Sequence, residues 1–226
     1  MAVEFDAWSN ETAAASGTLT WTHTPVGNPK GIFLWVVQNV GVTDEVDSVT
    51  YGSLTMTEVA GSPLVNTTGE PGAVYGYFNG SAIPTGVQTV TVNVNGTGSF
   101  KQGGVATLVA LANTETVEVD VSINGDLGAN PSTTLSLNGR ASWCGLAFFS
   151  GVGVVASATP LTGWTTRNET DFGAQLAGFY TYNTIGTTDV TAGWTQSADQ
   201  ATAICVAISE ASAAGSVLEF VTPQMT

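Results

Sequence analysis

Short apolar segments alternate with turns along almost the whole chain. Residues 18–24 (TLTWTHT) alternate threonine with Leu19, Trp21 and His23, which is the two-residue period of a strand with one buried face. Residues 32–39 are almost continuously apolar, as expected for a central strand that is covered on both faces. A sustained apolar stripe with helical spacing and capping residues is missing from the sequence. The pattern predicts an all-β protein.

The same reasoning predicts further strands along the chain. Residues 46–59 indicate two strands folded at Tyr51-Gly52-Ser53. The other predicted strands are 73–78, 88–94, 103–112, 117–123, 133–137, 141–150, 163–166, 178–182, 188–194 and 201–209. Short strands separated by turns at this spacing are typical of sandwiches. We therefore predict a jelly-roll or lectin-like antiparallel β-sandwich.

The second half of the chain repeats the order of segment types found in the first. A bulky apolar strand, a Thr-rich hairpin, an aromatic strand, a Thr/Val strand and a small-residue apolar strand follow one another twice. The two series begin at GIFLWVV (residues 31–37) and at SWCGLAFF (residues 142–149). This order indicates either an internally duplicated half-sandwich or only the monotony of Thr- and Val-rich strands.

Length and composition favour one domain with two distinct ends. A chain of 226 residues can bury enough surface to fold without a metal or disulfide framework. We assign residues 16–211 to one β-sandwich domain, 1–15 to an N-terminal extended arm and 212–226 to a C-terminal extended tail. Each apolar end either completes a sheet edge or reaches a neighbouring subunit by strand addition. The interface candidates are Val3, Phe5, Trp8, Val217, Leu218, Phe220 and Val221.

The charge balance restricts the partners. A net charge of −14 repels phosphate backbones and anionic membranes, so we predict neither nucleic-acid nor membrane binding. It favours solubility and attraction to a basic partner surface. Residues 1–6 lack the basic start of a secretory signal, and the apolar run 31–37 is too short to span a bilayer. We expect a protein made in the cytoplasm without a signal peptide.

Residues that could carry catalysis are sparse. His23 is the single histidine and lies in a Thr-rich strand, so we predict a hydrogen-bonded structural histidine. Cys144 and Cys205 lie in apolar runs, and we expect buried free thiols rather than a disulfide. The acidic residues 44–47, and Glu115, Glu118 and Asp120, are either solvated or a weak Ca²⁺ site. We predict no enzymatic site, no cofactor and no metal.

The aromatic residues divide into two groups. Trp35 and Trp143 lie in apolar runs and are predicted to be core residues. Trp164 and Trp194 are flanked by polar residues and are the better surface candidates, while core or half-buried packing stays the first expectation for each. Aromatic rings on a sandwich surface bind sugars or anchor subunit interfaces. The candidates for glycan binding are Trp164, Trp194, Tyr180 and Tyr182.

Three segments carry a resemblance to a known class of proteins. They are VTYGSLTMTEV (49–59), AVYGYF and IPTGVQTVTVNV (within 73–94), and TPLTGWTTRNETDFGAQLAGFYTY (159–182). This chain resembles β-sandwich proteins encoded among the structural genes of tailed phages, and related repeats in bacterial surface proteins. The resemblance implies a virion component of the capsid decoration (cement) or head-fibre type. Because the chain has no collagen-like, coiled-coil or Ig-repeat stalk, the compact decoration role is favoured.

The resemblance also implies partners and location. A decoration protein binds the outside of the phage head, so the expected partners are the major capsid protein or other virion subunits. A homo-oligomer, with a trimer favoured, is expected in the virion. The alternative interpretation is a carbohydrate- or receptor-binding sandwich module of a phage tail fibre or bacterial surface.

Overall fold

The computed structural model describes residues 3–13, 17–39, 45–66, 72–95, 100–109, 114–126, 130–135, 137, 142–151, 158–173, 175–184, 189–196 and 200–210. All regular elements in these ranges are β-strands, and every pairing between them is antiparallel. The predicted all-β antiparallel sandwich class is therefore confirmed.

The first half of the chain forms two facing sheets, called inner sheet 1 and outer sheet 1. Inner sheet 1 contains, in spatial order, β1 (Glu4–Ala13), β10 (Lys101–Val109), β3 (Gly31–Asn39), β8 (Gly72–Asn79) and β6 (Thr57–Glu58), with β7 (Leu64–Asn66) also paired to β8. Outer sheet 1 contains β2 (Leu19–His23), β9 (Gln88–Val94), β4 (Val46–Tyr51) and β5 (Leu54–Thr55).

The second half builds the same arrangement again. Inner sheet 2 contains β11 (Thr114–Asp126), β18 (Gln200–Glu210), β13 (Ser142–Gly151), β16 (Gln175–Thr184) and β15 (Thr165–Asp171). Outer sheet 2 contains β12 (Ser132–Leu135), β17 (Val190–Thr195) and β14 (Thr159–Pro160). The orders β1-β10-β3-β8 and β11-β18-β13-β16 correspond strand for strand. The repeat suspected from the sequence is thus a repeat of topology, but each copy is a complete two-sheet sandwich instead of half of a shared one.

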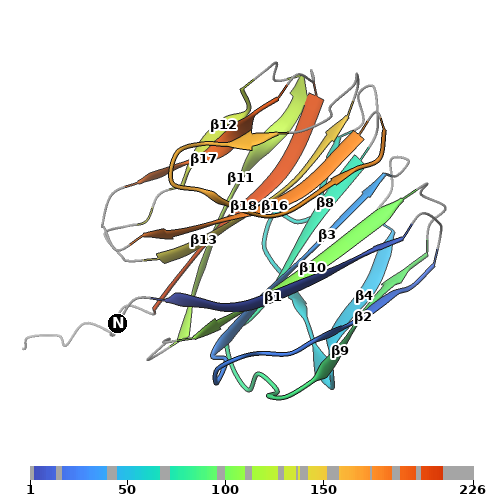
Figure 1. Ribbon diagram of the computed structural model, residues 1–226, viewed down its shortest axis with the longest axis vertical. Helices are drawn as coiled ribbons and strands as arrows, with labels where there is room; N and C mark the ends of the chain where they lie inside the picture. The colour runs from blue at the N-terminus through green and yellow to red at the C-terminus, as the bar shows by residue number, and fades with distance from the viewer. Residues whose placement is uncertain are drawn as a thin grey trace, which may run out of the picture.

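The four sheets stack as layers, with the two inner sheets facing each other in the middle (Figure 1). Three apolar clusters fill the three spaces between layers. Outer and inner sheet 1 enclose a cluster that includes Trp21, Leu34 and Tyr75. The central cluster, between the inner sheets, includes Phe33, Trp35, Trp143 and Phe179. Inner and outer sheet 2 enclose a cluster that includes Leu146, Phe148, Tyr180 and Trp194.

Two-sided burial explains the continuous apolar runs. In β3 the side chain of Leu34 enters the first cluster and that of Trp35 enters the central one, so both faces of the strand are covered. β2 lies in an outer sheet and buries only alternate residues. Within inner sheet 1, Gly104 of β10 lies opposite Trp35 of β3. A Cβ atom on Gly104 would lie 2.5 Å from the Trp35 ring, so only glycine fits beside that tryptophan.

Of the two alternatives for the predicted N-terminal extended arm, the structure shows the first, in which the segment completes a sheet edge. Residues Glu4–Ala13 form β1, which pairs with β10 along its length and completes the edge of inner sheet 1. Val3 is buried, and Phe5 packs against the central cluster. Trp8 is half-buried and lies opposite Ala106, a member of that cluster. The apolar side chains of this segment therefore pack against other strands of the same chain. The interface candidates Val217, Leu218, Phe220 and Val221 lie outside the described residues.

Candidate attachment site at the tip of the first sandwich

Three loops meet at one end of outer sheet 1. His23 ends β2 and pairs with Gln88, which begins β9, so the loops 24–30 and 80–87 leave the sheet side by side. The β4–β5 turn at residues 52–53 lies at the same end, because Gly52 N donates to Thr89 O over 2.8 Å. We call these three loops the first tip.

Exposed apolar side chains gather on the first tip. Among the described residues, the large apolar side chains that are exposed are Val26, with 86% of its surface accessible, and Val87, with 69%. One belongs to each long loop of the tip. Scattered exposed valines are ordinary, but both of these lie on loops that leave the same end of outer sheet 1. Lys30 is exposed in the same loop as Val26.

The conformation of loop 24–30 is fixed by an aspartate from the edge strand. Asp6 is the extra residue of a β-bulge in β1, between Phe5 and Ala7. Its carboxylate accepts hydrogen bonds from Val26 N at 3.2 Å and Gly27 N at 2.7 Å. Because a bulge changes the direction of a side chain, it allows Asp6 to leave the regular alternation of the strand and reach this loop.

A chain of hydrogen bonds links this carboxylate to the buried histidine. Thr107 Oγ1 donates to Asp6 Oδ2 over 2.8 Å. A hydroxyl has one hydrogen, so Thr107 Oγ1 must accept from His23 Nε2 at 3.2 Å. The other ring nitrogen, Nδ1, then accepts from Ser9 Oγ at 2.9 Å. Ser9 Oγ in turn accepts from Trp21 Nε1 at 3.1 Å.

This arrangement requires a neutral histidine. His23 is 2% exposed, and burial lowers its pKa from 6.5 to about 4, with the Asp6 charge opposing part of that shift. The predicted hydrogen-bonded structural histidine is confirmed. We call Asp6, Thr107, His23 and Ser9 the tip network, because it connects the interior of the first sandwich to loop 24–30.

A second polar group lies at the opposite end of the first sandwich. Lys101 is fully buried and its Nζ donates to Gly17 O over 3.1 Å. Burial lowers the pKa of Lys101, and the Glu45 charge opposes that shift. Tyr75 Oη accepts from Gln38 Nε2 at 3.0 Å and from Glu45 N at 3.2 Å. These groups close the end of the core instead of presenting a surface.

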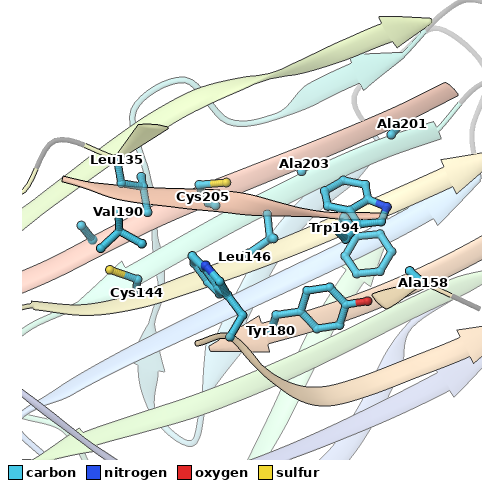
Figure 2. Packing of buried hydrophobic residues seen from close by; sticks show 14 of the residues in the cluster. Leu135, Cys144, Leu146, Ala158, Tyr180, Val190, Trp194, Ala201, Ala203 and Cys205 are labelled. Carbon is cyan, nitrogen blue, oxygen red and sulfur yellow. The ribbon is translucent and has the colours of Figure 1, made fainter. Parts of the chain in front are cut away.

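The predicted aromatic platform for glycans does not form. Trp194 and Tyr180 are fully buried in the cluster between inner and outer sheet 2, where Trp194 stacks on Phe148 at 4.4 Å (Figure 2). Trp164 is 7% exposed, and its Nε1 donates to Thr191 O over 2.9 Å. Tyr182 alone of the four is half-buried. Trp164 and Trp194 are therefore not surface residues, and the core or half-buried packing expected first for each is confirmed.

Other predicted residues have mixed outcomes. Trp35 and Trp143 are fully buried, as predicted. Cys144 and Cys205 are buried free thiols, also as predicted. Figure 2 shows both in the same apolar cluster. Of the acidic candidates, Asp44 lies outside the described residues, and the side chains of β11, with Glu115, Glu118 and Asp120, are outside the description too.

The comparisons with known proteins add no relative. No family model, curated protein or solved structure matches the chain. Across the described ranges there is no cluster of three or more His, Cys, Asp or Glu side chains placed to hold a metal ion. The same part of the chain contains no helix with the length and apolarity of a membrane span.

The first tip was missed in the sequence although it leaves a signal there. Val26 and Val87 lie in Pro- and Gly-containing loops, TPVGNPKG and IPTGVQ. A large apolar residue in a strand has a face to bury, whereas one in a tight loop has none. Apolar residues inside turns therefore indicate contact residues, but sequence could not show that these two loops adjoin.

Proposed function

We propose that the chain is a structural virion protein, a capsid decoration (cement) protein that attaches to the outside of a tailed-phage head through its first tip. The observation that carries this proposal is that the exposed Val26 and Val87 lie on two loops that leave the same end of outer sheet 1, of which the loop with Val26 is held by Asp6. An apolar patch on a rigid support is the usual basis of a protein–protein contact. The resemblance of the strand segments to tailed-phage structural proteins supplies the partner class.

The edges of the inner sheets favour tip contacts over edge-to-edge pairing. β1 carries Glu4, Asp6 and Glu11, and β15 carries Arg167, Glu169 and Asp171. The central strands β3, β8 and β13 carry no charged residue. Charged residues on edge strands discourage uncontrolled strand addition. The N-terminal strand addition that we expected is replaced in this proposal by docking of the tip.

The test uses particles of the phage whose genome encodes the chain. Purified virions should contain the protein, and particles that lack it should bind the recombinant chain in a sedimentation assay. Replacing Val26 and Val87 by Asp should weaken binding at least tenfold, because each valine loses an apolar burial of about 1.5–3 kcal/mol.

The matched control places the same charges on a neighbouring surface. Thr18→Asp and Thr20→Asp occupy exposed positions toward the other end of β2, away from the tip loops, and should bind like the unmodified chain. Absence of the protein from purified virions would contradict the decoration role. Unchanged binding of the Val26→Asp, Val87→Asp variant would show that attachment uses another surface.

A further inference from the structure

Ser9 lies at one side of the first sandwich, between two edge strands. It belongs to β1, the outermost strand of inner sheet 1, which contacts β2, the outermost strand of outer sheet 1. Ser9 is directly opposite Val105, whose side chain enters the cluster between the two sheets, and paired residues share one face of a sheet. Because Ser9 is only half-buried, it lies at the rim of that core, where small molecules in solution can reach it.

His23 is placed to take the proton of this serine. Ser9 Oγ donates to His23 Nδ1 over 2.9 Å. The imidazole is buried and neutral, so Nδ1 has a lone pair that can accept the proton completely. A hydroxyl that donates to a neutral imidazole is the arrangement of a nucleophile with its general base.

Two further groups fix the orientation of the imidazole. His23 Nε2 donates to Thr107 Oγ1 over 3.2 Å, and Thr107 Oγ1 donates to Asp6 Oδ2 over 2.8 Å. Burial lowers the pKa of His23, but the Asp6 charge raises it and so favours the imidazolium that forms when the ring accepts a proton. Thr107 and Asp6 therefore act as positioning residues for the base, as a third group does in other activated pairs.

The serine oxygen keeps a lone pair for bond formation. A hydroxyl oxygen has one hydrogen and two lone pairs. The hydrogen is donated to His23, and one lone pair accepts from Trp21 Nε1 at 3.1 Å. These two hydrogen bonds hold Ser9 Oγ in place and leave the second lone pair available.

We propose that Ser9 is a nucleophile that accepts an acyl group from a small activated carboxylic ester. Ser9 Oγ forms a bond to the carbonyl carbon, and the bond from that carbon to the ester oxygen breaks. The hydroxyl proton passes to His23 Nδ1 and from there to the departing alcohol or phenol oxygen. The products are acylated Ser9 and the free alcohol or phenol, so the chain itself is modified once. This reaction is independent of the proposed attachment to a phage head.

The test treats the folded, full chain with p-nitrophenyl acetate and measures the rate of acetylation of each serine by peptide mass spectrometry. Ser53 and Ser81 are exposed and serve as references within the same molecule. We expect Ser9 to be acetylated about 10²-fold faster than either, which is the lower end of what general-base catalysis contributes. A purely structural hydrogen-bond chain gives the opposite order, because Ser9 is less accessible than the reference serines. Acetylation of Ser9 at or below the rate of Ser53 would therefore overturn the proposal.

Variants then identify the base and the residues that position it. His23→Gln should lower the rate at Ser9 to that of the exposed serines, because the proton acceptor is lost. Thr107→Val should lower the rate by about 10²-fold through misplacement of the imidazole, whereas Thr107→Ser keeps the hydroxyl and should preserve the rate. Circular dichroism checks that each variant is folded. A folded His23→Gln chain that is acetylated at Ser9 as fast as the unmodified chain would also overturn the proposal, and the comparison of serines within the unmodified chain decides the question if a variant does not fold.

Discussion

The two sandwiches share a strand order but differ in what fills them. The first contains the tip network at one end, and the buried Lys101 with Gln38 at the other. The described interior of the second has no buried histidine or lysine: Gln196 Oε1 accepts from Ser150 Oγ and from Trp194 Nε1, each over 2.6 Å, beside an apolar cluster that includes Cys144 and Cys205. The same topology thus tolerates two kinds of interior. The strand order follows from the alternation of apolar and polar residues and from which strands lie at the sheet edges. The polar groups of the first repeat, in contrast, hold its loops in place.

The largest expected effect comes from removing a ring shared by both repeats. Phe179→Ala should lower the free energy of unfolding by about 3–5 kcal/mol, because its ring packs on Trp35, Phe33 and Trp143 in the central cluster. Urea unfolding measures the decrease in the free energy of unfolding, and hydrogen exchange shows which strands lose protection. Protection should drop in strands of both repeats.

A matched variant tests whether that effect is shared. Phe148→Ala removes a ring from the cluster between inner and outer sheet 2, where it stacks on Trp194. Its loss of protection should be larger in the second repeat than in the first. If Phe148→Ala lowered protection equally in both repeats, the two halves would unfold as one unit. The difference between the two interiors would then have no effect on the stability of either repeat alone.

The next effect is a pH dependence that belongs to the first repeat. Because burial lowers the pKa of His23 from 6.5 to about 4, the unfolded chain binds this proton more readily than the folded chain. The stabilisation of the folded chain by neutral His23 is fully present above pH 6.5 and is lost as the pH falls toward 4. The total loss in the free energy of unfolding is about 3 kcal/mol. Urea unfolding across this range measures it.

The control for the pH dependence is a variant without the imidazole. His23→Gln should flatten the stability profile between pH 6.5 and 4 relative to the unmodified chain, leaving the slope caused by carboxylates. Identical slopes in both proteins would contradict a neutral, buried His23.

A smaller effect is expected from the carboxylate that holds loop 24–30. Asp6→Asn should cost about 1–3 kcal/mol, because the amide places donors against the Val26 and Gly27 N–H groups or against the Thr107 hydroxyl. Amide exchange at Val26 and Gly27 should quicken. Glu4→Gln, on the exposed part of the same strand, should change neither quantity.

The smallest effect concerns the sealed interior of the second repeat. Burial raises the pKa of the Cys144 thiol to about 12, so the thiolate is scarce at pH 8. A thiol reagent should leave the native protein unmodified and react at a rate that follows unfolding. Rapid labelling of Cys144 in the native protein would show that this cluster opens more easily than its packing indicates.

Much of the fold was predictable from local patterns. The period of β2, the continuous burial of β3 and the hairpin at Tyr51-Gly52-Ser53 follow from residue order, because strand periodicity is a local property. The sequence left open whether the N-terminal arm completes a sheet edge, because the pairing of β1 with β10 joins residues far apart in sequence. Trp194 was named as a surface candidate from its polar neighbours, but these do not reveal which face another sheet will cover, and the residue is fully buried.

The candidate site was predictable only in part. His23 was expected to be a structural histidine, and it is. Its partners Ser9 and Thr107 lie on other strands of the sandwich, so their spacing along the chain could not predict these hydrogen bonds. Val26 and Val87 adjoin because β2 and β9 pair, which is a long-range register.

The sequence by itself determined that this chain folds into antiparallel strands, that its series of segments repeats, and that its two cysteines and its histidine are buried. These outcomes depend on alternation, β-branched residues and turn signals, which act over a few neighbouring positions. Only the tertiary structure decided that each repeat closes into its own sandwich and that the inner sheets bury both faces. It also decided that the two loops with exposed valines leave the same end of one sheet. Those features arise from pairing between distant strands and from packing between layers.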